Sequence, residues 1–482
     1  MADLDSQEIQ AIIGRVRDRL GGVQGAVEPE KVDRRRVPVD LGEGVFTAVE
    51  AAAESAWQAF QAYSEMGLEG RRVIIDAIRQ AMLDDAAELA QMAHVETGLG
   101  RTEDKTEKNR LVAAKTPGPE DLEPAVVTGD QGMTVTEYAP FGVVAAITPT
   151  TNPTATIINN TIAIVSAGNA LVFNAHPNAK GVSAENVRRI NRVVVAAGGP
   201  ENLVATVDEP TIESAQQLMR HPRVRLLMVT GGPGVVEEAL KTDKRAITAG
   251  PGNPPVVVDE TADIGLASTE IIRGASFDNN MVCTDEKEVF VVASRADELL
   301  RAMAGNGAVV LKEYQLRQLE RVIFERLGEA GKPGRINRKW IGQNAGKILA
   351  EIGVAVEDDL RLVVAEVTPD HSLVWTEQMM PVMPVVRVKD ADEGIDLAVR
   401  AEHGLRHTAS IFSSDVDRIT RMARAMNVSI FVANSANVAG LGGGGEDFSS
   451  FSIATPTGEG LTRPRTFSRI RRLAVVGSLR IV

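Results

Sequence analysis

The sequence LLMVTGGPG, at residues 226–234, joins an apolar run to a glycine-rich turn, and a helical pattern follows it. The run Leu226–Val229 predicts a buried strand. Small residues in the turn would let the phosphate of a dinucleotide approach the backbone at the start of the next helix. The turn is not a GxGxxG motif, however, and an ordinary tight connection between strand and helix fits it as well. The residues in question are Thr230, Gly231, Gly232 and Gly234.

Similar apolar runs recur on both sides of this turn. Before it lie Gly142–Ile147, Ala170–Phe173 and Leu203–Val207. After it come five further predicted strands: Pro255–Val258, Glu288–Val292, Val363–Ala365, Val385–Val388 and Ala409–Phe412. Nearly continuous apolar runs of this length are typical of parallel strands that are buried on both faces.

Helical patterns fill the intervals between these strands. One runs over Gly181–Ala197, and alanine-rich sequence predicts others from Val45 to about Glu96. Val135–Tyr138 predicts a short additional strand. Strands that alternate with helices indicate an α/β fold with a parallel sheet of the doubly wound kind.

The composition suits a large α/β protein and excludes several other classes. The chain has 482 residues, of which 44% are hydrophobic, enough for two or three domains. Its net charge is −13 and no basic patch stands out, so we expect no nucleic-acid partner. We expect no membrane association and no signal peptide, because no apolar run approaches a membrane span. Cys283 is the only cysteine, which excludes an internal disulfide and fits a cytoplasmic location.

Residues 5–20 predict a short amphipathic helix, which residues 21–39 would tether as a linker. Asp5 and Glu8 match a capping box at its start. Its apolar face would hold Ile9, Ile12, Ile13, Val16 and Leu20. An isolated helix of about 15 residues is only marginally stable in water. The helix therefore needs a docking surface, on the parent domain, on a second copy or on another protein.

Two other segments contain residues suited to chemistry. Ala249–Pro255, which includes Gly250, is so rich in Gly and Pro that it predicts a sharp turn or a close backbone approach, although a plain loop also fits. Ser276–Cys283 leads through two asparagines to the only cysteine. A nucleophilic cysteine needs a thiolate and a nearby donor for the oxyanion, whereas a lone cysteine is more often structural.

Considered together, these segments and their order resemble the aldehyde dehydrogenase superfamily from about Val45 to the end of the chain. Within it, the chain closely resembles the coenzyme A-acylating aldehyde dehydrogenases of bacterial microcompartments, the propionaldehyde and acetaldehyde enzymes. Six runs carry the resemblance: Thr97–Lys105, Lys115–Gly118, Ala249–Val258, Ser276–Cys283, Glu402–Ala409 and Thr455–Thr462.

The resemblance implies a reaction and a set of site residues. Cys283 matches the family nucleophile, and Asn152 matches the asparagine that binds the oxyanion. The implied reaction oxidises a short-chain aldehyde, such as propionaldehyde, to its acyl-CoA, with NAD taking the hydride. No metal site is implied. Cofactor contacts are implied for Asn174, His176, Thr230, Gly231, Gly232, Gly234, Gly250 and Glu377.

Two departures from the hydrolytic relatives bear on the reaction. Those enzymes place a general-base glutamate where this chain has Thr248–Pro251, which contains no carboxylate. Without that base, water attacks a thioester poorly, and the more nucleophilic thiol of coenzyme A can take its place. The hydrolytic relatives also carry a lysine for the adenosine ribose or its phosphate where this chain has Asn174, which favours NAD over NADP.

The family architecture implies a division of the chain into three parts. A Rossmann-like cofactor domain would cover 40–122 and 140–254, and a catalytic domain 255–438. An oligomerisation arm would comprise 123–139 and 439–482, so a homo-dimer or tetramer is expected. Residues 5–20 would bind a microcompartment shell protein and place the enzyme inside that compartment in the cytoplasm.

Other interpretations stay open at this point. The chain could be a hydrolytic aldehyde dehydrogenase that yields a free acid, or a catalytically silent assembly protein of a microcompartment lumen. His403 or His407 could deprotonate the thiol of coenzyme A, although a structural hydrogen bond is the simpler role. Small residues near the cysteine, Ser276 and Val282, suggest a short-chain aldehyde.

Overall fold

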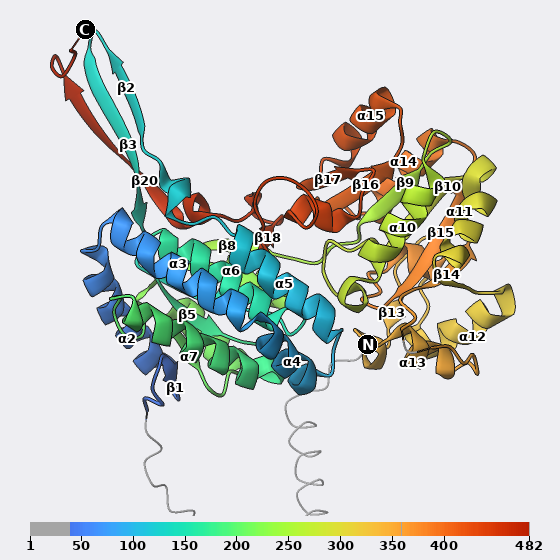
Figure 1. Ribbon diagram of the computed structural model, residues 1–482, viewed down its shortest axis with the longest axis horizontal. Coiled ribbons are helices and arrows are strands. Elements are labelled where there is room, and N and C mark those ends of the chain that lie inside the picture. Colours follow the sequence, from blue (N-terminus) through green and yellow to red (C-terminus); the bar gives the residue numbers. More distant parts are fainter. Residues whose placement is uncertain (1–38, 358, 482) are drawn as a thin grey trace, which may run out of the picture. The chain divides into compact units, whose positions relative to one another are not determined.

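The computed structural model describes residues 39–357 and 359–481. Two parallel sheets organise this part of the chain, and a three-stranded antiparallel sheet accompanies them (Figure 1). Both large sheets are covered by helices, which confirms the α/β class. The predicted helix of residues 5–20 and nearly all of its linker lie outside the described residues.

The first sheet has the strand order β1-β6-β5-β4-β7-β8, and all its neighbours pair in parallel. From β4 the chain winds outward through β5 and β6, and it then returns to the other side of β4 for β7 and β8. This reversal creates a topological switch point between β4 and β7, where α/β proteins bind ligands beyond the carboxyl ends of the strands. The strands are β1 (Val45–Phe46), β4 (Val143–Ile147), β5 (Ala170–Asn174), β6 (Val204–Val207), β7 (Val224–Thr230) and β8 (Arg245–Ala249).

Helices cover this sheet in more than one layer. α6 and α7 contact both the sheet and the helices α3, α4 and α5, which lie outside them. Every residue of α6 is buried, as expected for a helix enclosed on all sides. The helices are α2 (Val49–Ser64), α3 (Leu68–Asp84), α4 (Ala86–Thr97), α5 (Thr102–Lys115), α6 (Pro153–Ser166), α7 (Lys180–Ala196), α8 (Ile212–Arg220) and α9 (Pro233–Leu240).

The second sheet has the order β11-β14-β15-β10-β9-β16-β17, again parallel throughout. Along β9, Val256 and Val258 pack in one apolar cluster while Val257 packs in another, because successive side chains of a strand point to opposite faces. The strands are β9 (Pro255–Val258), β10 (Glu288–Val292), β11 (Val309–Val310), β14 (Val363–Val367), β15 (Val382–Val388), β16 (Thr408–Phe412) and β17 (Ile430–Ala433).

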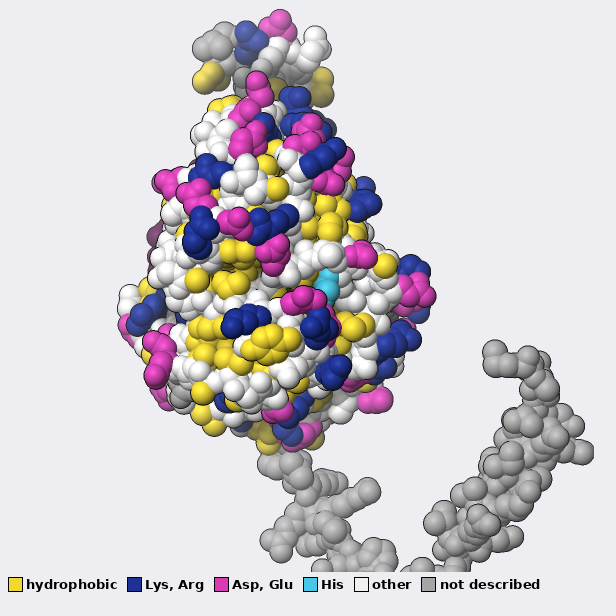
Figure 2. Space-filling model, turned by 90° about the vertical axis from the view of Figure 1, so that its right-hand side faces the viewer, with side chains coloured by type: hydrophobic (Ala, Val, Ile, Leu, Met, Phe, Trp, Pro, Cys, Tyr) yellow, Lys and Arg dark blue, Asp and Glu magenta, His cyan; other side chains and the backbone are white. Residues whose placement is uncertain are grey.

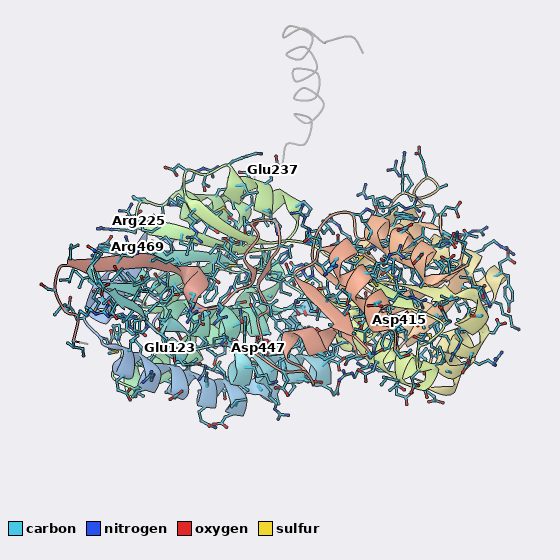
Figure 3. All side chains as sticks on the ribbon, turned by 90° about the horizontal axis from the view of Figure 1, so that it is seen from above. Glu123, Arg225, Glu237, Asp415, Asp447 and Arg469 are labelled. Carbon is cyan, nitrogen blue, oxygen red and sulfur yellow. The ribbon has the colours of Figure 1, made fainter. Side chains whose placement is uncertain are left out.

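Helices lie on both faces of the second sheet as well. α10 and α11 share the cluster that contains Val256, and α14 and α15 share the cluster that contains Val257. Asp415, labelled in Figure 3, caps α15 by accepting hydrogen bonds from the backbone N–H groups of Asp417 and Arg418. The helices are α10 (Ile264–Ala275), α11 (Ala293–Gly305), α12 (Glu313–Ile323), α13 (Ala345–Ala350), α14 (Ala391–Ala401) and α15 (Val416–Met426).

The antiparallel sheet consists of the hairpin β2 (Ala125–Gly129) and β3 (Gly132–Pro140) together with β20 (Ser468–Val476). Arg469 of β20 is labelled in Figure 3. Several large apolar side chains of this sheet are more than half exposed: Val126, Val127, Ile470, Leu473 and Val476. Two minor sheets are formed by β12 (Phe324–Arg326) with β13 (Arg335–Ile336) and by β18 (Ile453–Ala454) with β19 (Gly460–Leu461).

The predicted strands agree with the structure, but the helix predicted from Val45 is wrong at its beginning. Val45 and Phe46 form β1, which pairs with β6, and α2 begins at Val49. Two apolar residues are too few to distinguish the 3.6-residue period of a helix from the two-residue period of a strand. Hydrogen bonding to β6 makes Val45 and Phe46 a strand. No helix in the described part of the chain is both long and apolar enough for a membrane span.

On the face drawn in Figure 2, basic and acidic side chains are interspersed.

Candidate active site

A cavity of about 900 Å³ lies at the carboxyl ends of the first sheet. Its wall includes the segments that follow four parallel strands: residues 148–152 after β4, 175–178 after β5, 231–235 after β7 and 250–251 after β8. The cavity therefore occupies the switch point that the strand order creates. Met281, Val282 and Cys283, which precede β10 of the second sheet, also line the cavity.

The structure brings all ten predicted site residues to the wall of this one cavity. They come from segments up to 225 positions apart, since Asn152 and Glu377 both belong to the set. The ten are Asn152, Asn174, His176, Thr230, Gly231, Gly232, Gly234, Gly250, Cys283 and Glu377.

Cys283 is held on the cavity wall by close backbone packing. A Cβ atom on Gly252 would lie only 2.4 Å from the carbonyl oxygen of Cys283, so only glycine fits there. This confirms the close backbone approach predicted for Ala249–Pro255. Burial raises the pKa of the Cys283 thiol to about 12, and the charge of Glu377 acts in the same direction, whereas Lys287 opposes it.

The raised pKa of Cys283 predicts how its alkylation depends on pH. The thiolate is the reactive form, so the rate should rise about tenfold per pH unit for as long as the pH stays below the pKa. With iodoacetamide and the enzyme alone, we expect this rise to continue to at least about pH 9.5, without the plateau that an ordinary thiol of pKa about 8.5 would show. Intact mass measures the rate, and circular dichroism checks the fold at each pH.

Glu377→Gln is the matched variant for this experiment. It removes the second-largest contribution to the raised pKa of Cys283 and keeps the size of the side chain. Because less negative charge then opposes the thiolate, alkylation at about pH 8 should be faster than in the wild type. A plateau near pH 8–9 in the wild-type enzyme would contradict the assignment of a strongly desolvated thiol.

Asn152 stands at the start of α6 but does not cap it. No hydrogen bond joins its side chain to the helix backbone, and Pro153 occupies the first helical position. Its Oδ1 accepts a hydrogen bond from Lys108 Nζ at 2.5 Å, and its Nδ2 makes only a long contact of 3.3 Å to Thr151 Oγ1. The Nδ2 group carries two N–H bonds and donates one of them to Thr151, so the second is available to a ligand in the cavity, as an oxyanion donor must be.

The turn after β7 suits a phosphate group. Gly232 and Gly234 have no other atoms within 4 Å of the position where a Cβ would stand. Gly232 is the N-cap residue of α9, whose first N–H groups favour an anion. Thr148 and Thr150, on the wall beside β4, have buried hydroxyl groups without hydrogen-bond partners among the described residues. Open space and unpaired polar groups fit a dinucleotide in this part of the cavity.

Asn174, His176 and Glu377 complete the predicted cofactor set. Asn174 is fixed by the start of α8, because its Oδ1 accepts from Ser214 Oγ at 2.5 Å. His176 Nδ1 accepts from the backbone N–H of Asn178, and burial lowers the pKa of its imidazole. Glu377 Oε1 accepts from the backbone N–H of Gly252 at 3.5 Å, and burial raises the pKa of its carboxyl group. These three side chains border the cavity from different strands and loops.

His403 and His407 are absent from the residues that line this cavity. His403 Nε2 lies 2.9 Å from the carbonyl oxygen of Trp375, and His407 Nδ1 lies 2.9 Å from Thr408 Oγ1. Burial lowers the pKa of His407 to about 3. Both histidines therefore make the structural hydrogen bonds that the simpler interpretation predicted.

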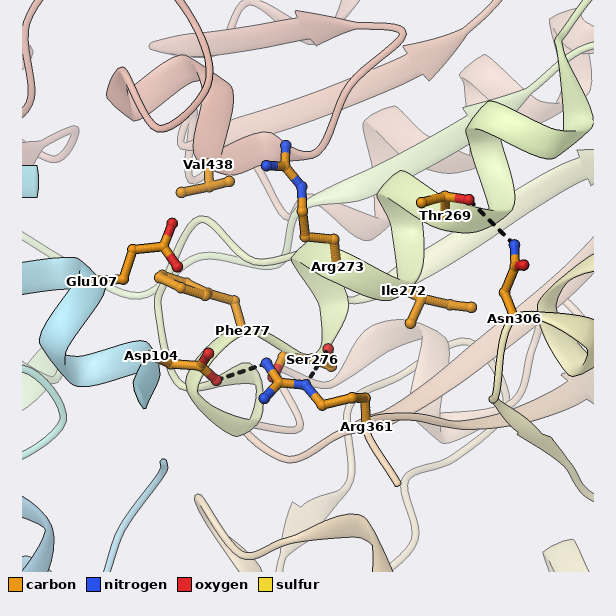
Figure 4. Close-up of a pocket in the computed structure, with 10 residues that line it drawn as sticks. All are labelled: Asp104, Glu107, Thr269, Ile272, Arg273, Ser276, Phe277, Asn306, Arg361 and Val438. Atoms are coloured by element: carbon orange, nitrogen blue, oxygen red, sulfur yellow. Dashed lines mark hydrogen bonds and ion pairs between the residues drawn. The ribbon is translucent and has the colours of Figure 1, made fainter. Parts of the chain in front are cut away.

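Ser276 requires a correction. It does not line the large cavity, whereas Val282 does. Ser276 instead lies on a smaller cavity of about 240 Å³, where it contacts Arg361 (Figure 4). The residues between Ser276 and Cys283 turn sharply, so closeness in sequence did not place Ser276 beside the cysteine. The size of the aldehyde therefore cannot be inferred from Ser276.

Sequence reasoning missed the side chains that support this site from behind. Lys108, which bonds Asn152, and Asp278, which bonds Lys108, are both fully buried. Asp278 lies within the run Ser276–Cys283, but nothing in that run marks its role, and Lys108 lies outside all six runs. Among the described residues, no group of three His, Cys, Asp or Glu side chains could hold a metal ion.

A cysteine and an asparagine amide on the wall of one cavity, together with a glycine turn at a switch point, are the groups expected of an oxidoreductase that acts on a carbonyl group. The sequence matches the model of the aldehyde dehydrogenase family over residues 39–309 and 361–459. The chain belongs to this family.

Within this family, the chain is similar to enzymes that transfer an acyl group to coenzyme A. The chain is 51% identical over 440 residues to the acetaldehyde dehydrogenase (acetylating) of Salmonella typhimurium, which covers 91% of this chain and 94% of that one. A propionaldehyde dehydrogenase of Rhodopseudomonas palustris, solved with bound CoA and an acylated cysteine, is similar with a TM-score of 0.88, 45% identity and coverage of 92% and 100%. A propionaldehyde dehydrogenase from the fucose utilisation microcompartment of Clostridium phytofermentans has a TM-score of 0.88, 43% identity and coverage of 91% and 100%.

Proposed function

We propose that this protein oxidises a short-chain aldehyde to its acyl-CoA, with NAD as the hydride acceptor and Cys283 as the nucleophile. One observation carries the proposal: Cys283 and Asn152 share a cavity with the glycine turn after β7, and Gly250 stands on its wall. The relatives named as acetylating dehydrogenase and propionaldehyde dehydrogenase support it.

The residues on the wall divide the reaction between them. The Cys283 sulfur adds to the aldehyde carbon, and the carbonyl oxygen becomes an oxyanion that the Asn152 amide and the Cys283 N–H stabilise. NAD, when bound, supplies the acceptor for the hydride that leaves this carbon. A thioester on Cys283 remains. The sulfur of coenzyme A then adds to that thioester, and Cys283 departs as the thiolate. The same residues serve the reverse reaction.

The wall of the cavity favours a thiol over water as the second nucleophile. Residues 248–251 contribute no carboxylate that could deprotonate water, and Gly250 and Pro251 line the cavity there. Two carboxylates do lie on the wall, and both are engaged: Glu377 accepts the Gly252 N–H and is assigned to the cofactor, and Glu238 pairs with Arg220. A thiol needs less help from a base than water does, so transfer to coenzyme A is favoured over hydrolysis.

NAD is the proposed partner in preference to NADP. Asn174 stands where the hydrolytic relatives carry a lysine, and it adds no positive charge to the wall. A 2′-phosphate would find no compensating cation at that residue.

Turnover with and without coenzyme A tests the proposed function. With propanal and NAD, NADH formation should continue only when coenzyme A is present, and the product should be propanoyl-CoA by mass. Without it, the reaction should stop after about one equivalent of NADH per site, because the thioester on Cys283 persists. Equal turnover without coenzyme A, with propanoate as product, would instead make the protein a hydrolytic aldehyde dehydrogenase.

The proposed partners extend beyond the small molecules. The exposed apolar residues of the β2-β3-β20 sheet suit burial against a second copy of the chain, as a homo-dimer or tetramer. Placement inside a bacterial microcompartment, through a shell protein that binds residues 5–20, is supported by the microcompartment source of the Clostridium phytofermentans enzyme. The residues that would make this contact lie outside the described part of the chain.

A further inference from the structure

Two lysines of α5 are buried beneath the active site. Lys105 and Lys108 are 2% and 1% exposed, and both contact the carboxylate of Asp278, which is 0% exposed. A buried charge is costly unless it is paired and hydrogen-bonded. Two ammonium groups on one carboxylate leave an excess of positive charge, so the cluster needs a reason beyond neutralisation. Burial opposes ionisation of Asp278, but Lys108 and Lys105 outweigh it and lower the pKa of Asp278.

The second contact of Lys108 supplies that reason. Its Nζ donates to Oδ1 of Asn152 at 2.5 Å, as well as to Asp278. Lys105 makes no such contact, because its other partner is the backbone carbonyl of Thr151 at 3.4 Å. Lys108 thus connects the carboxylate directly to the proposed oxyanion donor, and Lys105 does not.

An ammonium group can only donate hydrogen bonds, whereas a side-chain amide has one end that accepts and one that donates. Lys108 therefore fixes which end of the Asn152 amide it faces: Oδ1 points to Lys108, and Nδ2, which donates one N–H to Thr151, keeps its second N–H for the cavity. The positive charge of Lys108 beside the amide oxygen also draws electrons from the amide, which makes its N–H groups better hydrogen-bond donors. Orientation and polarisation act in the same direction.

The carboxylate that holds Lys108 also anchors the loop that carries the cysteine. Asp278, Asn279 and Asn280 have φ values of 44°, 58° and 64°, an unfavourable conformation for three consecutive residues other than glycine. Asp278 is held by its own bonds: its Oδ1 accepts from the Arg101 N–H at 2.8 Å, and its N–H donates to Asp104 at 2.9 Å. Arg361 holds Asp104 in turn, at the small cavity of Figure 4. Asp278 thus ties the cysteine loop to the lysine that orients Asn152.

The geometry points to Lys108 as a positioning residue that orients and polarises the Asn152 amide toward the oxyanion formed on Cys283. This inference rests on the proposed function and adds a residue to it. Lys108 touches neither substrate nor cofactor, because it is absent from the wall of the cavity. Its effect should therefore appear only in steps that create an oxyanion.

The test compares Lys108→Met with Lys105→Met in the full-length enzyme. Both variants remove one ammonium from Asp278, but only the first frees the Asn152 oxygen. The first-turnover rate of NADH formation should fall about 10- to 100-fold in Lys108→Met and much less in Lys105→Met. Alkylation of Cys283 by iodoacetamide passes through no oxyanion, so its rate should match the wild type in both. Melting temperatures are measured first, and Lys108→Gln, which retains an N–H donor, should lose less activity than Lys108→Met.

A double variant decides whether Lys108 acts through Asn152. Lys108→Met combined with Asn152→Ala should be no slower than Asn152→Ala alone, because the amide is already absent. Losses that multiply, or a Lys108→Met rate within about threefold of the wild type, would overturn the inference. Those results concern only this residue, because wild-type turnover that depends on coenzyme A is the separate test of the proposed function. If Lys108→Met unfolds, Lys108→Gln enters the same cycle with the same criteria.

Discussion

Replacing Cys283 with alanine is expected to lower aldehyde oxidation by about 10⁴- to 10⁶-fold, the loss seen when an enzyme nucleophile is removed. The reason is that the hydride leaves a carbon that must first be bonded to sulfur, and the cavity wall offers no second cysteine. NADH formation with propanal and coenzyme A measures the loss. Binding of NAD, followed by fluorescence, should persist, because the glycine turn after β7 is unchanged.

The single cysteine makes a direct chemical test possible. Propanal and NAD without coenzyme A should add one propanoyl group to the wild-type chain by intact mass, and none to Cys283→Ala. Because Cys283 is the only thiol, a thioester of this mass needs no further mapping. Turnover retained by Cys283→Ala would contradict covalent catalysis on this residue. If the variant lost NAD binding as well, Cys283→Ser would separate a folding defect from the loss of the nucleophile.

Much of the fold could be predicted because the strands that form the two sheets are long apolar runs. Pro255–Val258 and Glu288–Val292 match β9 and β10 residue for residue. The order of the strands could not be predicted, because it is set by contacts far apart in sequence. β4 lies between β5 and β7, and that arrangement brings separate loops of the first sheet to one cavity. The edge strand β8 was not predicted, because its apolar residues Ala246, Ile247 and Ala249 are interrupted by Thr248 and form no continuous run.

The active site likewise has a part that could be predicted from the sequence and a part that could not. Its wall residues could be predicted from the resemblance to the family and from the rule that ligands bind at the carboxyl ends of parallel strands. The buried residues behind the wall, Lys105, Lys108 and Asp278, could not be predicted. α5 carries charged side chains around much of its surface, a pattern typical of a solvated helix. Lys105 and Lys108 are buried because α5 packs against α3, α4 and α6, and Asp278 pairs with both lysines from another part of the chain. Such a contact leaves no local pattern.

Asn152→Ala is expected to lower the rate of NADH formation by about 10²- to 10³-fold, the usual cost of losing one oxyanion donor. The variant keeps Cys283 and the cofactor turn, so alkylation by iodoacetamide and binding of NAD should stay near wild-type values. A rate within about threefold of the wild type would mean that the Cys283 N–H suffices or that another group binds the oxyanion.

Asn152→Asp distinguishes loss of the donor from loss of shape. Aspartate has the size of asparagine and can still accept a hydrogen bond from Lys108, so packing at the start of α6 is retained. It has no N–H groups, however, and its negative charge would face the oxyanion. If the amide acts as a donor, Asn152→Asp must be at least as slow as Asn152→Ala, although it changes the structure less. If Asn152 only fills space before Pro153, Asn152→Asp must be the faster of the two. The two roles therefore predict opposite orders for the same pair of variants.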